Sequence, residues 1–364
     1  MATSISTTFD AIYLTGNLLE QVNITTDSTS LVVEVFLQDT RIFASVYYPY
    51  MNIVCIRDIR SIVEAAMQDR GLVMATLKLM ATEPLPDASN ITYDEDGNIH
   101  IEFDGKDPES VRASVSDIKI IYSAFRTADD STAFLSKRFL TTRHSALVPR
   151  RGGHVLLSNY TRAYAESSNY ALILYHDAHS EGHQSYSFNL GRVQSTSETI
   201  VTKDLTHDYF KAIVDQNTQA SDSTVDGVEY HVGNRQFSIF FTDEEPTDTF
   251  TFLNAFNLTE TAYLFGATTT KTEVERSEAV CGRKTQFYDE TIVVKHEVET
   301  SVLSSDEAKW LNQLLTSKLV QRPISDSQSA QVLITDISSE ITNSDNDRTR
   351  LKFSWKYADG NEWL

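Results

Sequence analysis

The chain has 364 residues, of which 41% are hydrophobic and 23% are charged, so it can bury a globular core and is long enough for two or three domains. Lysine and arginine number 31 and aspartate and glutamate 51, which gives a formal net charge of −20. A surface this acidic repels phosphate groups, and no basic cluster offers an exception, so nucleic acid and anionic lipid are excluded as expected partners.

Export and membrane signals are also missing from the sequence. The first residues have no basic region and no apolar core of signal-peptide length, and no stretch approaches the ~18–20 apolar residues of a membrane helix. There are two cysteines, Cys55 and Cys281, whereas a secreted disulfide scaffold would have more. We therefore expect synthesis in a cytoplasm without a signal peptide, and no insertion into a membrane.

The first predicted domain, residues 1–145, contains two alternating runs that predict strands over residues 31–37 and 41–48. Three residues separate these runs, which is typical of a tight hairpin. Apolar residues then recur at spacings of three and four over residues 56–69, and Gly71 follows them. This pattern predicts an amphipathic helix that ends just before the glycine.

The second predicted domain, residues 150–245, follows a boundary segment with little periodicity. Residues 170–175 form a nearly continuous apolar run, which predicts a strand buried on both faces. Alternation over residues 186–190 and 237–241 predicts two further strands. A polar segment with a proline, residues 243–246, ends the domain.

The third predicted domain, residues 247–364, contains a short amphipathic helix over residues 305–317. Residues 351–357 alternate strictly, with four large apolar side chains on one face, which indicates a half-buried antiparallel strand at a sheet edge. Trp363 and Leu364 follow a polar segment, and an apolar end of this kind docks on something when it is ordered. This strand face is expected either to be covered by the predicted helix within the chain or to be offered to a neighbour, and we expect these last residues to contribute to an interface.

Together these elements predict an all-β chain. We expect two or three mostly antiparallel, sandwich-like domains, with two short amphipathic helices packed on the sheets. Helix should account for less than about a fifth of the chain, whereas about a third is average for globular proteins.

Three histidines form the sharpest cluster of potential metal ligands. His176, His179 and His183 lie within eight residues, and imidazole is a common zinc ligand. The segments on either side are predicted to be strands, so the histidines are expected in the turn that connects them. A turn lacks the helical spacing that would align two rings on one face. We predict a polar, histidine-rich loop and no metal site, so that changing all three to alanine should lower the melting temperature little.

Two acidic segments resemble calcium loops. Residues 94–98, Asp-Glu-Asp-Gly-Asn, match the start of such a loop, but Phe103 stands where the bidentate glutamate should follow. Residues 343–347 have a similar composition. Aspartate and asparagine beside glycine are also typical of β-turns, so both segments are predicted to be turns without calcium.

The sequence contains no motif of a nucleophilic enzyme: no Gly-x-Ser-x-Gly, no Cys-x-x-Cys, no His-Glu-x-x-His and no phosphate loop. We predict no catalytic residue, no cofactor and no enzyme activity. A hydrolase with acidic residues scattered over several strands stays open, because paired carboxylates need not be adjacent in sequence. The 16 tyrosines and 18 phenylalanines mostly alternate within strands, which favours core over a glycan-binding groove.

The third domain also carries a family resemblance. Its segments are residues 249–257 and 260–263, then residues 308–311 on the predicted helix, and finally residues 332–336 and 353–359. In this order they resemble uncharacterised structural proteins of the tail or baseplate type, encoded in phages and prophages of Bacteroidetes. The resemblance implies an all-β virion component that is made in the host bacterial cytoplasm and assembles with copies of itself and with other virion proteins. It brings no catalytic residues.

The sequence therefore favours a virion structural protein that acts by assembly. The alternative is a carbohydrate-binding or adhesin-like β-sandwich protein, which would use aromatic side chains exposed on one sheet face. The third possibility is the hydrolase described above. Glycan binding would support the second function, and turnover lost on single Asp or Glu changes would support the third.

Overall fold

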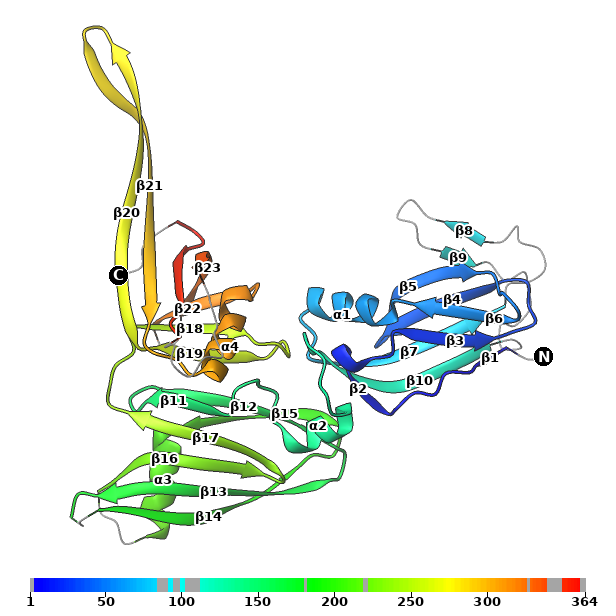
Figure 1. Ribbon diagram of the computed structural model, residues 1–364, viewed down its shortest axis with the longest axis horizontal. Helices are drawn as coiled ribbons and strands as arrows, with labels where there is room; N and C mark the ends of the chain where they lie inside the picture. Colours follow the sequence, from blue (N-terminus) through cyan, green and yellow to red (C-terminus); the bar gives the residue numbers. More distant parts are fainter. Residues whose placement is uncertain are drawn as a thin grey trace. The chain divides into compact units, whose positions relative to one another are not determined.

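The computed structural model describes the chain over residues 3–83, 91–93, 99–101, 112–179, 182–218, 222–325, 328–338 and 349–360. Strands account for 59% of the described residues and helices for 14%. Most strands pair antiparallel, in several separate sheets (Figure 1). The predicted all-β fold class and its low helix content are therefore confirmed.

The chain divides into two compact units. Unit 1 comprises residues 1–135 and the tripeptide 255–257, and unit 2 comprises residues 136–254 and 258–364. Unit 1 contains one hydrophobic cluster, and unit 2 contains two. The domain boundaries proposed from the sequence stay a prediction.

Unit 1 contains two larger sheets that enclose its core, in the strand orders β1-β3-β6 and β2-β10-β7-β4-β5, and a short hairpin, β8-β9. Helix α1 packs into the same core. The bounds are β1 Ser4–Ile5, β2 Ile12–Leu14, the 3-10 turn η1 Thr15–Asn17, β3 Gln21–Thr25, β4 Leu31–Leu37, β5 Thr40–Tyr47, β6 Ile53–Arg57, α1 Ile59–Asp69, β7 Met74–Thr82, β8 Ile91–Tyr93, β9 Ile99–Ile101 and β10 Arg112–Ile121.

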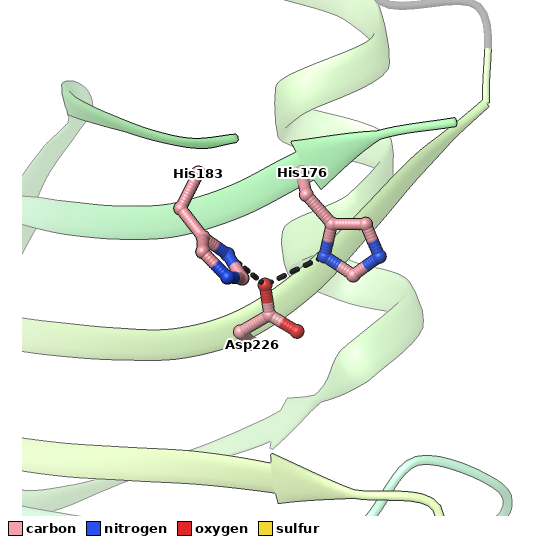
Figure 2. Close-up of side chains that lie close together, drawn as sticks. All are labelled: His176, His183 and Asp226. Carbon is pink, nitrogen blue, oxygen red and sulfur yellow. Dashed lines mark hydrogen bonds and ion pairs between the residues drawn. The ribbon is translucent and has the colours of Figure 1, made fainter. Parts of the chain in front are cut away.

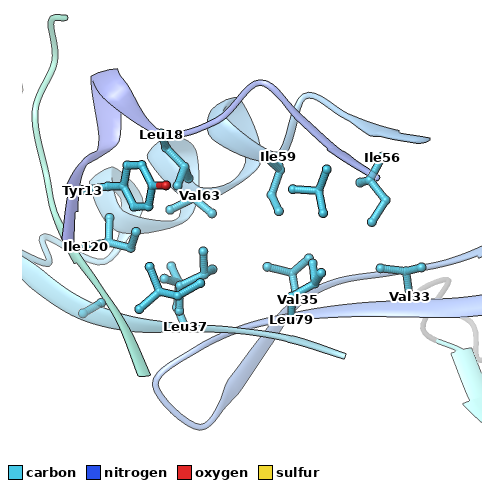
Figure 3. Close-up of a cluster of buried hydrophobic side chains, with 14 of the residues drawn as sticks. Tyr13, Leu18, Val33, Val35, Leu37, Ile56, Ile59, Val63, Leu79 and Ile120 are labelled. Atoms are coloured by element: carbon cyan, nitrogen blue, oxygen red, sulfur yellow. The ribbon is translucent and has the colours of Figure 1, made fainter. Parts of the chain in front are cut away.

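Alternation in the sequence positions this core. Val33 and Val35 of β4 face Ile56 of β6 and Val63 of α1 across it (Figure 3), and all four are buried. The predicted hairpin is present, because β4 and β5 pair antiparallel and close through the pair Leu37 and Thr40.

Helix α1 begins three residues later than predicted. Ile56 belongs to β6, and its side chain enters the same core as the helix, so the sequence periodicity joined a strand end to a helix start. Gly71 follows the helix with a φ of +61°, a left-handed conformation that favours glycine, as expected for a helix stop.

The first part of unit 2 is a five-stranded sheet in the order β11-β17-β16-β13-β14. The pair β12-β15 and helix α3 contribute side chains to the same hydrophobic cluster. Helix α2, Ser131–Lys137, spans the boundary between the two units along the chain. The bounds of the other elements are β11 Ser145–Pro149, β12 His154–Thr161, β13 Glu166–Asp177, β14 His183–Gln194, β15 Thr199–Thr206, α3 His207–Asn217, β16 Ser223–Val232 and β17 Arg235–Thr242.

The second part of unit 2 is a seven-stranded sheet in the order β19-β18-β22-β23-β24-β21-β20, with helix α4 packed into its core. Ser304 caps α4 in a reciprocal capping box with Glu307, which explains why the helix starts there. The bounds are β18 Asp248–Leu253, β19 Thr259–Leu264, β20 Gly266–Cys281, β21 Lys284–Thr300, α4 Ser305–Thr316, β22 Val320–Ser325, β23 Gln328–Ser338 and β24 Lys352–Tyr357.

The prediction for residues 170–175 was wrong in one respect. The run lies in β13, but Leu172 and Leu174 are about two-fifths exposed, while Ala171, Ile173 and Tyr175 are buried. The hydrophobic core packs against only one face of this sheet. The continuous apolar run therefore places alternate side chains on a buried face and on an exposed face.

The prediction of a sheet edge at residues 351–357 was also wrong. β24 pairs with β23 on one side and with β21 on the other, so it is an interior strand. The predicted face is correct, since Leu351, Phe353, Trp355 and Tyr357 are all buried in the core that α4 covers. The apolar face of β24 is therefore used within the chain.

The sequence analysis predicted helices α1 and α4 but did not predict α2 and α3. Phe210 and Val214 of α3 are buried at a spacing of four, and Thr206 caps the helix by accepting from the Tyr209 amide. A signal was therefore present, but it is only three turns long and lies between two strand patterns.

Some sequence predictions concern residues that lie outside the described part of the chain. These are the two calcium-like segments, residues 94–98 and 343–347, and the terminal Trp363 and Leu364.

Candidate functional site

The feature of unit 2 that its core does not explain is the hairpin of β20 and β21. The two strands pair from Gly266 and Thr300 to the closing pair Cys281 and Lys284. β24 pairs with β21 only over residues 296–299. Beyond that point the hairpin is a two-stranded ribbon that extends far past the rest of its sheet (yellow in Figure 1).

One face of this ribbon carries exposed apolar side chains, interspersed with charged ones such as Arg276. Val274 pairs with Ile292, and Glu278 pairs with Phe287, and residues paired across an antiparallel ladder point to the same face. Val280 lies two residues beyond Glu278 on the same strand, so it shares this face. Phe287 is 57% exposed and Val280 is 75% exposed. The guanidinium of Arg276 lies 5.0 Å from the ring centre of Phe287, which agrees with this register.

The same face is buried at the base of the hairpin. Val298 is buried in the core of the sheet, and the ring of His296 stacks on Trp355 with 3.9 Å between centroids. The core-facing side of the sheet thus continues along the hairpin into solvent. We name the exposed part, made of Val274, Val280, Phe287 and Ile292, the hairpin face.

The hairpin differs from the rest of the chain in charge. Residues 271–295 contain five basic and five acidic residues, 5 − 5 = 0, so the other residues carry 26 − 46 = −20. Arg283 and Lys284 make the tip itself basic. A second copy therefore repels this neutral hairpin less than it repels the chain as a whole.

A polar groove of about 740 Å³ is a second candidate site in unit 2. Its lining includes Arg151, His154, Asp248, Thr261 and Arg322. Asp248 is buried and lies 3.4 Å from the Arg322 guanidinium, and the His154 ring lies 3.1 Å from the Thr261 hydroxyl. Positively and negatively charged side chains line this concave surface together with hydrogen-bonding groups, which suits a polar ligand.

The histidine cluster is only partly brought together. His176 is the second-to-last residue of β13 and His183 begins β14, and the two form a cross-strand pair with ring centroids 5.5 Å apart. His179 lies in the turn, where its ring is 3.3 Å from Asp177 and 73% exposed. Two of the three histidines are therefore on strands, contrary to the prediction that the turn holds them all.

A residue that the sequence reading missed joins the two strand histidines. Asp226 Oδ2 lies 2.7 Å from His176 Nδ1 and 3.0 Å from His183 Nδ1. Figure 2 shows this carboxylate facing both rings. Asp226 lies at a register shift, since Leu174 pairs with Gly227 but Tyr175 pairs with Val225. A bulge re-aims a side chain, and here it turns the carboxylate toward both rings.

Arg150 holds the other side of this carboxylate. Its Nη2 donates to Asp226 Oδ1 at 2.7 Å, and its Nε donates to the carbonyl of Val225 at 3.3 Å. Arg150 also pairs with Asp243, and this hydrogen bond holds the pKa of Asp243 below its usual value. The Asp-Gly pair at 226–227 inside an alternating strand was the available sequence signal, since an isolated glycine in a strand indicates a bulge.

A buried polar network lies elsewhere in unit 2, beside α4. Glu260 accepts from Trp310 Nε1 and from Asn254 Nδ2, both at 2.5 Å, and lies 3.5 Å from Arg143 Nε. The Arg143 guanidinium also stacks over Trp310, 4.1 Å from the ring centre. Burial lowers the pKa of Arg143, and the Glu260 carboxylate offsets part of that effect.

Among the described residues, no helix is long and apolar enough to cross a membrane. No family model matches the chain, and no curated protein matches it. One solved structure, described as a crystal structure of CBD12 from CALX1.2, is 10% identical, and the match covers 64% of this chain and 79% of that chain with a TM-score of 0.17. At that score the likeness supports no argument, so the function of this chain is argued from its own residues.

Proposed function

We propose that this chain is a structural subunit that acts by assembly rather than by catalysis, as a tail or baseplate component of a virion. The observation that carries the proposal is the β20–β21 hairpin with its exposed hairpin face. A two-stranded hairpin by itself is marginally stable in water, and large apolar side chains gathered on one exposed face indicate a site of interaction. The hairpin is therefore suited to being covered by a partner.

A second copy of the chain is the partner that the charges favour. Two identical chains repel each other through a net charge of −20, so a closed contact needs apolar surface or locally basic residues. The hairpin has both, because its face exposes apolar side chains and its tip carries Arg283 and Lys284, and residues 271–295 carry no net charge.

The edge of the hairpin offers a further means of contact. β20 is the outermost strand of the seven-stranded sheet, and along residues 271–281 it pairs with β21 alone. An edge strand presents backbone donors and acceptors in a row, which a strand of a neighbouring subunit can extend. Neighbouring virion proteins would be joined in the same way.

A charge placed on the hairpin face tests this function. Phe287→Glu is expected to weaken self-association at least tenfold, because the carboxylate would have to be buried in the contact. Gln286→Glu is the matched control, since it adds the same charge at the next residue, which points to the opposite face and pairs with Ala279. Sedimentation velocity over a range of concentrations measures both, and circular dichroism checks that the fold is kept.

Two outcomes would contradict the proposal. One is a native chain that stays monomeric at high concentration and forms no ordered particle in electron micrographs. The other is an equal effect of Phe287→Glu and Gln286→Glu, which would remove the hairpin face from the contact.

Carbohydrate binding is the second candidate function, and the polar groove is the observation that favours it. If the groove binds a glycan, Arg151→Ala should weaken binding of the best glycan on an array at least tenfold, because Arg151 is an exposed charged donor of the lining. Arg192→Ala, an exposed arginine outside the groove, should leave binding unchanged. An array on which no glycan binds would end this alternative.

A further inference from the structure

We infer that His176, His183 and Asp226 form a binding site for one zinc-like divalent cation on the open end of the five-stranded sheet of unit 2. The side chains come from three neighbouring strands, β13, β14 and β16, and their ligand atoms all lie within 4.8 Å of one another. This inference replaces the sequence-based prediction that the histidine cluster holds no metal, and it is independent of assembly.

The distances suit a small coordination sphere. Zinc lies about 2.0–2.2 Å from imidazole nitrogen and carboxylate oxygen, so neighbouring ligand atoms of a tetrahedral site are about 3.3 Å apart. The carboxylate oxygen and the two ring nitrogens are separated by 2.7 Å and 3.0 Å (Figure 2). Side-chain rotations that lengthen these two oxygen–nitrogen distances by a few tenths of an ångström would bring them to the tetrahedral value.

The backbone under the site is fixed by pairing rather than by a flexible turn. His176 and His183 are direct cross-strand partners, and β13 also pairs with β16, which carries Asp226. The bulge at Asp226 places its side chain with the two rings. Ligands held on paired strands lose little conformational freedom when a metal binds, in contrast to ligands in a loop.

Arg150 acts as the outer partner of the carboxylate ligand. By donating to Asp226 Oδ1 it leaves Oδ2 directed at the two rings. Outer partners of this kind orient metal ligands. The positive charge of Arg150 is balanced by Asp243, so Asp226, Arg150 and Asp243 together present one net negative charge to an incoming cation.

The ligand types select the class of metal. Two imidazoles and one carboxylate suit zinc and its neighbours, whereas calcium and magnesium require mainly oxygen ligands. Three protein ligands leave at least one position of a tetrahedral ion for water or for another ligand. His176 and His183 are 41% and 62% exposed, so an ion can reach the site directly from solvent.

Zinc titration of the chelator-treated full chain, followed by calorimetry, tests the site. We expect one zinc ion per chain, with binding weakened at least tenfold in His183→Ala and in Asp226→Asn. His179→Ala is the matched control, because this histidine lies in the same segment but contacts Asp177 instead. It should bind zinc as the native chain does, and calcium or magnesium should not compete.

The melting temperature is a second measurement, which distinguishes loss of zinc binding from loss of folding. Zinc should raise the melting temperature of the native chain and of His179→Ala, and should not raise that of His183→Ala, whose exposed side chain contributes little to the core. Equal zinc affinity in the native chain, His183→Ala and Asp226→Asn would overturn the inference. So would a native chain that binds no zinc.

Discussion

Glu260→Ala is expected to lower the free energy of unfolding of unit 2 by about 3–5 kcal/mol, because it leaves the buried Arg143 guanidinium without its counter-charge. It also removes the acceptor of two buried hydrogen bonds, from Trp310 and from Asn254. All three tryptophans of the chain, at positions 310, 355 and 363, lie in unit 2. Tryptophan fluorescence during denaturant unfolding therefore measures the loss in this unit alone.

Two further variants separate the network from simple loss of volume. Glu244→Ala removes an exposed carboxylate and should change the free energy of unfolding by less than about 0.5 kcal/mol. The double change Arg143→Met with Glu260→Leu should cost less than Glu260→Ala alone, because it leaves no buried charge unpaired. If Glu260→Ala costs under about 1 kcal/mol, the carboxylate does not hold this network together.

Excising the extended hairpin is expected to abolish self-association without destabilising unit 2. The variant deletes residues 273–293 and joins the paired residues Thr272 and Val294 through Asn-Gly, a two-residue sequence that favours a tight hairpin turn. Association should weaken at least a hundredfold, since the variant loses the apolar face, the basic tip and the free edge together.

The same variant has an internal control. The hydrophobic cluster beside α4 contains none of the deleted residues. Its unfolding transition, followed by tryptophan fluorescence, should therefore move by less than about 0.5 kcal/mol. A shortened chain that associates as strongly as the native chain would place the contact elsewhere and leave the hairpin without this role.

Local patterns predicted the strands and buried faces well, because alternation depends on neighbouring residues. The side chains that period two selects in β4 and β24 are all buried, although Val32 and Ser354, on the other face of their strands, are buried as well. The position of β24 within its sheet was wrong, because strand order depends on pairings between segments far apart in the chain. Edge and interior strands with one buried face have the same pattern.

The metal cluster shows the same limit. His176 and His183 are close in sequence and were noticed, whereas Asp226 lies 43 residues beyond His183. The third ligand, Asp226, reaches the histidines only through a bulge and the pairing of β13 with β16. Neither feature can be predicted from the spacing of residues in the sequence. The long hairpin was also not predicted as such, although part of β21 was recognised by its alternation at residues 292–298.

The interior position of β24 has a consequence for the order in which the chain folds on the ribosome. β21 ends at Thr300 and its partner β24 begins at Lys352, so 52 further residues must be made before the two can pair. At about 5–20 residues per second this takes roughly 3–10 s, whereas a hairpin such as β20–β21 forms in about 1–10 μs. The hairpin therefore exists well before the sheet at its base can close. During that interval Val298 and His296 lack the cover of Phe353 and Trp355, so this strand of the nascent chain is open to premature contacts.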